Sequence, residues 1–174
     1  MTGRTRAPTD NLAIADLHSH VLPGVDDGAA GLDESLAMLE AAWRQGARLV
    51  FATPHWCPPG YTSGPAMVRA RFSMLREAAA LRLPGLRLCL GQEVEDTHSR
   101  LAEMLSRGEV CALADSRYAL VEFYLEQDAR AIRAALLKAL DKGVRPVLAH
   151  AERYPGLQEQ PDIYGELHRR GVCL

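Results

Sequence analysis

Two periodicities of apolar residues alternate along this chain of 174 residues. Short apolar runs, typical of buried strands, are separated by longer segments in which apolar residues recur every three or four positions, as on one face of a helix. Leu32, Leu36, Leu39 and Trp43 form one such helical stripe, which ends at Gly46. The predicted strands are 11–16, 48–53, 86–90, 118–123 and 146–150, with another opening at 172–174. The predicted helices are 32–46, 68–79, 98–107, 128–140 and 161–170.

This succession of strands and helices predicts an α/β fold built from parallel βαβ units. With 48% hydrophobic residues, the chain is long enough to bury one substantial core, so a single domain is expected. No Gly-x-Gly-x-x-Gly loop follows a strand, which favours a barrel-like arrangement over a dinucleotide-binding sheet. The predicted architecture is therefore a distorted, TIM-like βα barrel.

Composition excludes several classes of protein. The formal net charge of −2 and the scattered basic residues do not indicate broad binding of nucleic acid or of an acidic membrane surface. Residues 1–11 lack the apolar segment of a secretory signal, and no window has the length of a membrane span, so we expect a cytoplasmic protein. We predict a disordered tail over 1–11 and a domain over 12–174. The four cysteines lie far apart, which is typical of reduced thiols.

Two histidines close to the end of the first predicted strand are candidate metal ligands. His18 and His20 are two positions apart, so in extended backbone their side chains share a face and can hold one ion. Gly24 and Gly28 allow the following loop to bring Asp27 back toward them. An isolated pair of this kind is also common on protein surfaces, so the pair alone does not establish a metal site.

Further potential ligands occur in or just after the last residues of other predicted strands. They are His55, Glu93, Glu122 and His150. Each alone has an ordinary structural explanation, such as a loop cap, an ion pair with arginine or a hydrogen-bonded core histidine. Together they would meet at the end of the barrel where active sites form. The mixed nitrogen and oxygen donors suit divalent cations, and a carboxylate, with Glu93 preferred, can bridge two metals in a hydrolase.

Five sequence blocks, in order, resemble one superfamily. DLHSHVLPGVDDGA, ATPH, GQEVE, SRYALVEF and LAHAERY are similar to the signatures of the polymerase and histidinol phosphatase (PHP) superfamily. Within it, the chain most resembles bacterial manganese-dependent tyrosine phosphatases of capsule and exopolysaccharide gene clusters. The resemblance implies a distorted βα barrel and removal of phosphate from the phosphotyrosine tail of a kinase that controls polysaccharide synthesis. It implies two or three divalent ions, Mn²⁺ first, with Fe, Zn, Mg or Co as alternatives.

The resemblance also implies a role for each candidate residue. His18, His20 and Glu93 would hold one metal. Glu93, Glu122 and His150 would hold a second, and Asp27 and His55 a third. Arg153, whose planar guanidinium matches phosphate geometry, would bind the phosphate as a catalytic residue. A metal-bound water or His55 would protonate the leaving group, and the sequence does not choose between them.

The sequence departs from the superfamily pattern in one respect. The superfamily has a late S-D-x-H block that completes two of its metal sites, and this sequence contains none, so we expect a domain incomplete at its C-terminus that lacks the last βα units. Histidinol phosphatase-like or other PHP phosphoester hydrolysis is one alternative, and an inactive remnant that binds metal or a kinase tail is another.

Cys111 and Arg117 have the C-x5-R spacing of cysteine phosphatases. The segment has no glycine cradle for phosphate, so we interpret this spacing as chance.

Overall fold

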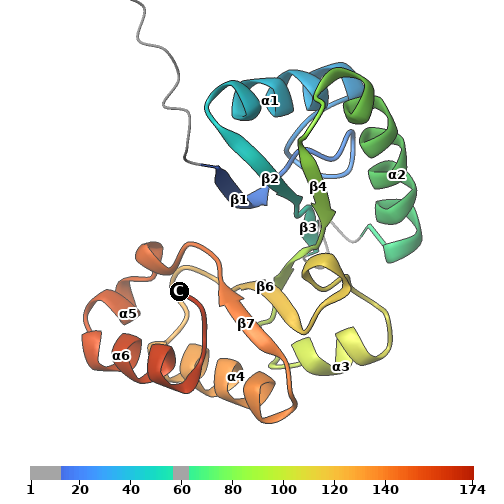
Figure 1. Ribbon diagram of the computed structural model, residues 1–174. Coiled ribbons are helices and arrows are strands. Elements are labelled where there is room, and N and C mark those ends of the chain that lie inside the picture. Colours follow the sequence, from blue (N-terminus) through green and yellow to red (C-terminus); the bar gives the residue numbers. More distant parts are fainter. Residues whose placement is uncertain (1–12, 57–62) are drawn as a thin grey trace, which may run out of the picture.

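The structure, a computed structural model, describes residues 13–56 and 63–174 (Figure 1). The predicted disordered tail at 1–11 lies outside these residues. The strands are β1 (Ile14–Ser19), β2 (Ala47–Ala52), β3 (His55–Trp56), β4 (Arg87–Leu90), β5 (Glu93–Glu95), β6 (Tyr118–Glu122) and β7 (Arg145–Leu148). The helices are α1 (Leu32–Arg44), α2 (Pro65–Arg82), α3 (Leu101–Ser106), α4 (Ala129–Asp141), α5 (Pro155–Gln158) and α6 (Pro161–Arg170). The 3₁₀ turns are η1 (Leu113–Asp115) and η2 (Ala151–Arg153).

The strands form two parallel sheets, which confirms the predicted α/β class. The first sheet has the order β1-β2-β4 and the second the order β3-β5-β6-β7. In Figure 1, α1 and α2 lie with the first sheet, and α3 to α6 lie with the second. Closure of these sheets into one barrel stays a prediction, because in the described residues they are two separate hydrogen-bonded sheets.

Two segments of the chain pass from the first sheet into the second. β2 is followed after two residues by β3, and β4 is followed after two residues by β5. Pro54 has no N–H to continue the ladder of β2, and its carbonyl instead accepts the N–H of Glu93 at 3.1 Å. A β-carbon at Gly91 would lie 2.5 Å from a terminal side-chain carbon of Leu113, so glycine lets Leu113 pack closely against the second crossing. The predicted strands end at these crossings, and the short continuations β3 and β5 were not predicted.

The helix predictions agree with the structure in type, with shifts at the ends. Predicted helix 68–79 is the middle of the longer α2, and 98–107 shortens to α3. Asp128 caps α4 as predicted, since its carboxylate accepts the N–H groups of Arg130 and Ala131. The predicted strand opening at 172–174 reduces to one bridge, between Val147 and Cys173. Helix α5, a single turn, was not predicted.

Each half of the molecule has its own apolar core. In the first half, α1 and α2 pack Leu39 and Leu75 against Val50 of β2. In the second half, α4 and α6 pack Ile132 and Leu167 against the sheet. Full burial of one such side chain stabilises the folded state by about 1.5–3 kcal/mol, so these cores hold the strand ends in fixed positions. None of the helices in the described ranges is long and apolar enough to cross a membrane.

Candidate metal centre

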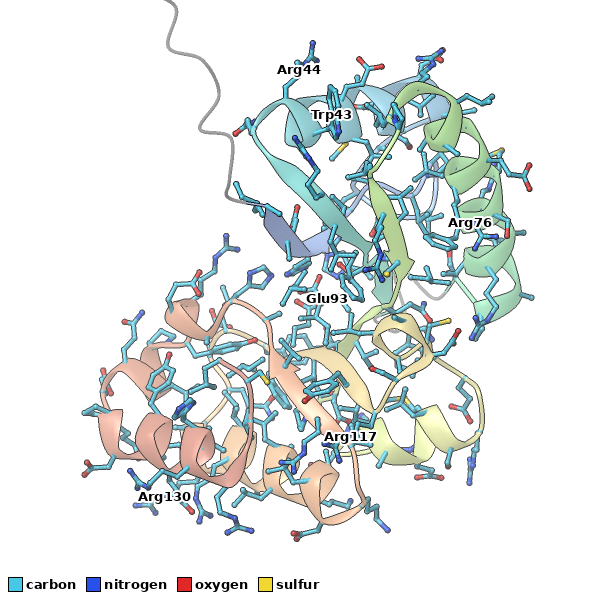
Figure 2. All side chains as sticks on the ribbon, viewed as in Figure 1. Trp43, Arg44, Arg76, Glu93, Arg117 and Arg130 are labelled. Atoms are coloured by element: carbon cyan, nitrogen blue, oxygen red, sulfur yellow. The ribbon has the colours of Figure 1, made fainter. Side chains whose placement is uncertain are left out.

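The candidate ligands from five strands meet where the two halves of the molecule join. His18 lies near the end of β1 and His20 directly after it, and His55 and Glu93 begin β3 and β5. Glu122 ends β6, and His150 follows β7 by two residues. Parallel pairing puts the carboxyl ends of β6 and β7 at one side of their sheet. His55 and Glu93 reach the same place because they follow the carboxyl ends of β2 and β4 after two residues. Figure 2 shows Glu93 between the two halves.

Glu93 is the centre of this group, and its side chain is completely buried. One carboxylate oxygen, Oε2, lies 3.0 Å from Nε2 of His18, 3.3 Å from Nε2 of His20 and 3.1 Å from Nδ1 of His55. The other oxygen, Oε1, lies 3.1 Å from Nε2 of His150. Four imidazoles therefore surround one carboxylate, as the preference for Glu93 as a bridging ligand requires.

The hydrogen bonding of Glu93 indicates that the group suits a cation. Its two carboxylate oxygens are the only buried side-chain nitrogen or oxygen atoms without a hydrogen-bond partner among residues 13–56 and 63–174. The surrounding imidazole nitrogens are at hydrogen-bond distance but not at hydrogen-bond angles. Leaving buried carboxylate oxygens unsatisfied costs on the order of 1–3 kcal/mol or more each, which a bound cation would offset. Imidazole and carboxylate donors together fit Mn, Fe, Co or Zn.

Three overlapping groups of side chains could each hold an ion. Within each group, one ligand atom per residue lies within 4.8 Å of the others. The groups are His18, His20 and Glu93; His20, Asp27 and His55; and His55, Glu93 and Glu122. The first group is the first predicted ligand set. In the third, His55 stands where the prediction placed His150, because Nδ1 of His55 lies 2.9 Å from Oε1 of Glu122.

Asp26, which was not predicted as a site residue, orients the ring of His20 and holds the backbone of His55. Its side chain is fully buried, and Oδ2 accepts a hydrogen bond from Nδ1 of His20 at 2.8 Å. The same oxygen accepts the backbone N–H of His55 at 2.9 Å, and Oδ1 accepts the N–H of Gly28 at 3.1 Å. A carboxylate behind a metal-binding histidine fixes its tautomer and turns the other ring nitrogen toward the ion. For His20 that nitrogen is Nε2, which faces Glu93.

Charges in the centre are balanced between carboxylates and imidazoles. Burial alone would raise the pKa of Glu93. The adjacent imidazoles of His18, His20 and His55 outweigh burial and lower this pKa to about 2. Burial alone would lower the pKa of His20, but the hydrogen bond to Asp26 and the nearby carboxylate charges of Asp26 and Glu93 raise it to about 10. The hydrogen bond that Nδ1 of His55 donates to the carboxylate of Glu122 is the largest cause that raises the pKa of His55. A divalent ion would replace the protons that neutralise these carboxylates.

Arg153 lies one turn beyond His150, in η2, and its N–H bonds the carbonyl of His150 at 2.7 Å. Its side chain is 62% exposed, and the guanidinium lies 3.8 Å from Glu152, its ion-pair partner in the described part of the chain. The structure thus places Arg153 beside the ligand cluster in sequence and at the same strand end, with its guanidinium accessible to solvent. Its role as the phosphate-binding residue stays a prediction.

The C-x5-R segment lacks the features of a cysteine phosphatase. Cys111 is buried, and burial raises the pKa of its thiol, which disfavours the reactive thiolate. Its backbone N–H bonds the side chain of Gln92 at 2.9 Å, so the residue is part of the packing near the second crossing. Arg117 directly precedes β6 and therefore lies at the opposite end of the strand from Glu122.

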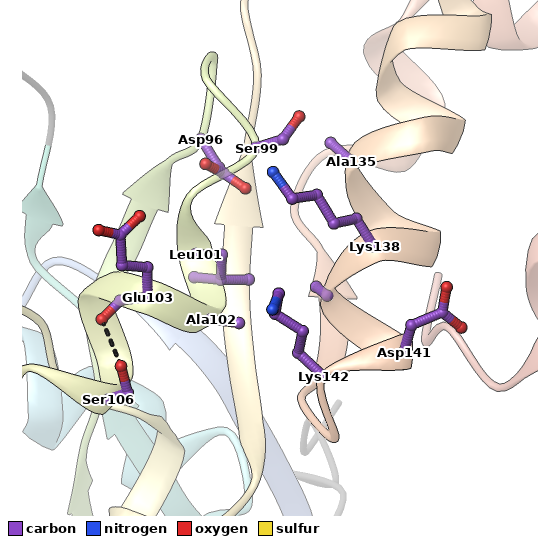
Figure 3. Close-up of a pocket in the computed structure, with 11 residues that line it drawn as sticks. Asp96, Ser99, Leu101, Ala102, Glu103, Ser106, Ala135, Lys138, Asp141 and Lys142 are labelled. Carbon is purple, nitrogen blue, oxygen red and sulfur yellow. Dashed lines mark hydrogen bonds between the residues drawn. The ribbon is translucent and has the colours of Figure 1, made fainter.

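A cavity of about 800 Å³ lies away from the candidate ligands, between α3 and α4 (Figure 3). Lys138 and Lys142 of α4 line it together with the carboxylates of Asp96, Glu103 and Asp141. Amines and carboxylates both face this space, so it has no clear charge preference. The candidate metal ligands lie instead around Glu93.

Similarity to known proteins agrees with this arrangement. The family described as "Capsular polysaccharide synthesis, CpsB/CapC" matches residues 14–174. The chain belongs to the CpsB/CapC family. It is 33% identical over 158 residues to the tyrosine-protein phosphatase CpsB of Streptococcus agalactiae, covering 91% of this chain and 65% of that protein. It is 36% identical over 154 residues to CpsB of Streptococcus pneumoniae, covering 88% of this chain and 63% of that protein.

A solved structure of the family has the same fold. It comes from a study of YwqE from Bacillus subtilis and CpsB from Streptococcus pneumoniae, described as unique metal-dependent tyrosine phosphatases. The TM-score is 0.82 at 32% identity, over 91% of this chain and 64% of that chain. The chain thus spans slightly less than two thirds of the length of these relatives. The predicted resemblance to capsule-associated tyrosine phosphatases is confirmed at the level of family and fold.

Proposed function

We propose that this chain forms the metal centre of a phosphomonoester hydrolase that removes phosphate from tyrosine side chains, with Mn²⁺ as the working ion. The observation that carries the proposal is the buried Glu93 carboxylate, whose two unsatisfied oxygens face four imidazoles. Family membership supports the choice of phosphotyrosine, because the similar proteins are named tyrosine-protein phosphatases.

The proposed ligand sets share Glu93. His18, His20 and Glu93 hold one ion. Glu93 and Glu122 hold a second, with His55 beside both carboxylates and with His150 as the predicted further ligand, 3.1 Å from Oε1 of Glu93. Asp27 and His55 hold a third, with Nε2 of His55 3.7 Å from Oδ1 of Asp27. When bound, such ions neutralise phosphate oxygens and lower the pKa of coordinated water.

The chain's own residues then position the substrate. The guanidinium of Arg153 offers two parallel N–H donors to two phosphate oxygens and so holds the phosphoryl group as its charge develops. Its side chain is 62% exposed and its ion pair with Glu152 is long, at 3.8 Å, so a phosphate that arrives from solvent can reach the guanidinium. His55 lies between Asp27 and Glu122, where it acts as a ligand or supplies the proton that the tyrosyl oxygen needs on leaving.

The proposed partner is the phosphotyrosine tail of a bacterial kinase that controls polysaccharide assembly. The description of the family as acting in capsular polysaccharide synthesis supports this partner. The four imidazoles around Glu93 are 18–27% exposed, so an extended, phosphorylated peptide can reach their edge of the centre from solvent. Arg153 and the bound ions would recognise its phosphate, whereas the aromatic ring would remain outside the ligand cluster.

The test uses the purified full chain, stripped with a chelator and then reloaded with Mn²⁺. We expect release of phosphate from a phosphotyrosine peptide only after Mn²⁺ is added. Glu93→Gln and His150→Ala should lower turnover by at least a hundredfold, and Arg153→Ala should lower it by at least tenfold. Arg130→Ala, which removes an exposed arginine on α4 far from the ligands, is the matched control.

Three outcomes would change the proposal. Hydrolysis of histidinol phosphate in preference to the phosphopeptide would assign another substrate to the same centre. Tight Mn²⁺ binding without release of phosphate from either substrate would leave a metal-binding chain without turnover. Phosphopeptide hydrolysis that persists in Glu93→Gln at the wild-type rate would remove the centre from the reaction.

A further inference from the structure

A second polar cavity lies at the other end of the second sheet. Its volume is about 280 Å³, and it is lined by Arg117, Leu140, Asp141, Gly143, Arg145 and Arg170. Arg117 precedes the ligand Glu122 by five residues, which corresponds to roughly 16 Å along an extended strand. Figure 2 shows Arg117 well away from Glu93. The cavity is therefore separate from the metal centre.

The fold brings three arginines to this cavity from three elements. Arg117 precedes β6 and Arg145 begins β7, and the carbonyl of the former accepts the N–H of the latter at 2.8 Å. Arg170 ends α6 and is followed by Gly171, which has the left-handed φ of +96°. A β-carbon at Gly171 would overlap Nη1 of Arg145, so the guanidinium of Arg145 lies directly over this glycine. Glycine thus permits the close approach of α6 to β7.

Positive charge in the cavity exceeds the negative charge that faces it. Asp141 is the one carboxylate that lines it, and its Oδ1 lies 3.9 Å from the guanidinium of Arg170. Among the residues that the structure describes, no carboxylate lies within 4.0 Å of the guanidinium of Arg117 or Arg145. The C-terminal ends of α4 and α6 each add about half a negative charge. Three guanidinium groups still leave the space net positive.

We propose that this cavity binds a phosphate-type oxyanion. Guanidinium groups present paired N–H donors that match the oxygens of phosphate, and three of them around one space can hold a doubly charged anion. Arg145, half-buried and without a carboxylate partner in the described chain, is the main binding residue. The cavity between α3 and α4 differs, because carboxylates there accompany its lysines. The proposal does not depend on the phosphatase activity.

The experiment titrates inorganic phosphate into the full chain after removal of metal with a chelator, at low ionic strength, and follows binding by calorimetry and by NMR signals of the arginine Nε–H groups. We expect saturable binding that shifts the Nε–H signals of Arg117 and Arg145. Arg145→Gln and Arg170→Gln should each weaken binding at least tenfold. Arg130→Gln removes the same charge at the other end of α4 and should leave binding unchanged.

Several results would overturn the proposal. One is phosphate binding to Arg145→Gln and Arg170→Gln as tight as to the wild-type chain. Another is an absence of saturable binding to the wild-type chain at low salt. Because Arg145→Gln also removes packing on Gly171, circular dichroism must show that it folds, and the exposed Arg170→Gln provides the independent variant. Binding only to vesicles that contain phosphatidylglycerol, without binding of free phosphate, would assign the face to a membrane surface instead.

Discussion

Replacement of Asp26 by asparagine tests whether the candidate centre depends on its supporting carboxylate. The substitution keeps the size and shape of the side chain but removes its charge and one of its two acceptor oxygens. Asp26 now accepts three hydrogen bonds, at 2.8 Å from His20, 2.9 Å from His55 and 3.1 Å from Gly28. Asparagine can satisfy either the bonds to His20 and His55 or the bond to Gly28, and its amide N–H₂ would face the remaining donor.

The size of the effect follows from these bonds. A hydrogen bond to a charged acceptor contributes about 1.5–3 kcal/mol, so the less damaging orientation of the asparagine lowers the free energy of unfolding by about 2 kcal/mol. Loss of a carboxylate behind a metal-binding histidine typically lowers metal affinity about 10- to 100-fold, which corresponds to about 1.4–2.7 kcal/mol. We therefore expect both weaker Mn²⁺ binding and a lower stability in the metal-free chain.

Calorimetric titration of Mn²⁺ and denaturant unfolding of the stripped chain measure the two effects separately. Asp33→Asn, an identical change at an exposed position in the first turn of α1, is the control and should alter neither. If Asp26→Asn binds Mn²⁺ within twofold of the wild-type chain, Asp26 does not orient metal ligands. A loss of stability without a loss of affinity would restrict it to holding the loop.

Three other predictions concern the same structure. Gly28→Ala should weaken Mn²⁺ binding in calorimetry and destabilise the chain by more than 1 kcal/mol, because a β-carbon there would overlap the carbonyl of His20; wild-type affinity would contradict this. Since the pKa of His20 is raised to about 10 in the metal-free chain, Mn²⁺ must displace its proton, so the apparent affinity should rise up to about tenfold per pH unit below that pKa. Titrations in buffers of different ionisation enthalpy count this proton, and affinity independent of pH would refute the exchange. Asp128→Ala should lower the free energy of unfolding by about 1 kcal/mol without changing Mn²⁺ affinity, through loss of the α4 cap; an unchanged denaturation midpoint would argue against the cap.

The sequence predicted the fold class and the convergence of ligands because both depend on periodic patterns. Apolar runs predicted the main strands, and parallel order alone then placed His18, Glu122 and His150 at the same strand ends. The short strands β3 and β5 were missed because two or three residues have no detectable period. Their pairing depends on neighbouring strands, which a local pattern does not contain.

Asp26 was missed for a related reason. It stands beside Asp27 in a loop, and spacing cannot tell which of two adjacent carboxylates points inward. The turn decides: Asp26 is fully buried behind His20, whereas the side chain of Asp27 is 60% exposed. An aspartate two residues before a glycine is a local turn signal, which Asp26 and Gly28 follow, and it could have indicated Asp26. The excess of positive charge around Arg145 could not be predicted for the same reason, because it depends on elements that meet only in the folded chain.

The two crossings from the first sheet to the second have a consequence for how the molecule unfolds. Neither apolar core supplies a complete set of ligands: His18 and His20 belong to the first half, Glu122 and His150 to the second. Unfolding of either half breaks a site that takes ligands from both, so the cation dissociates and the stabilising free energy of binding is lost. Ion binding should therefore merge two separable unfolding transitions into one, and a chelator should let hydrogen exchange proceed at different rates in the two cores.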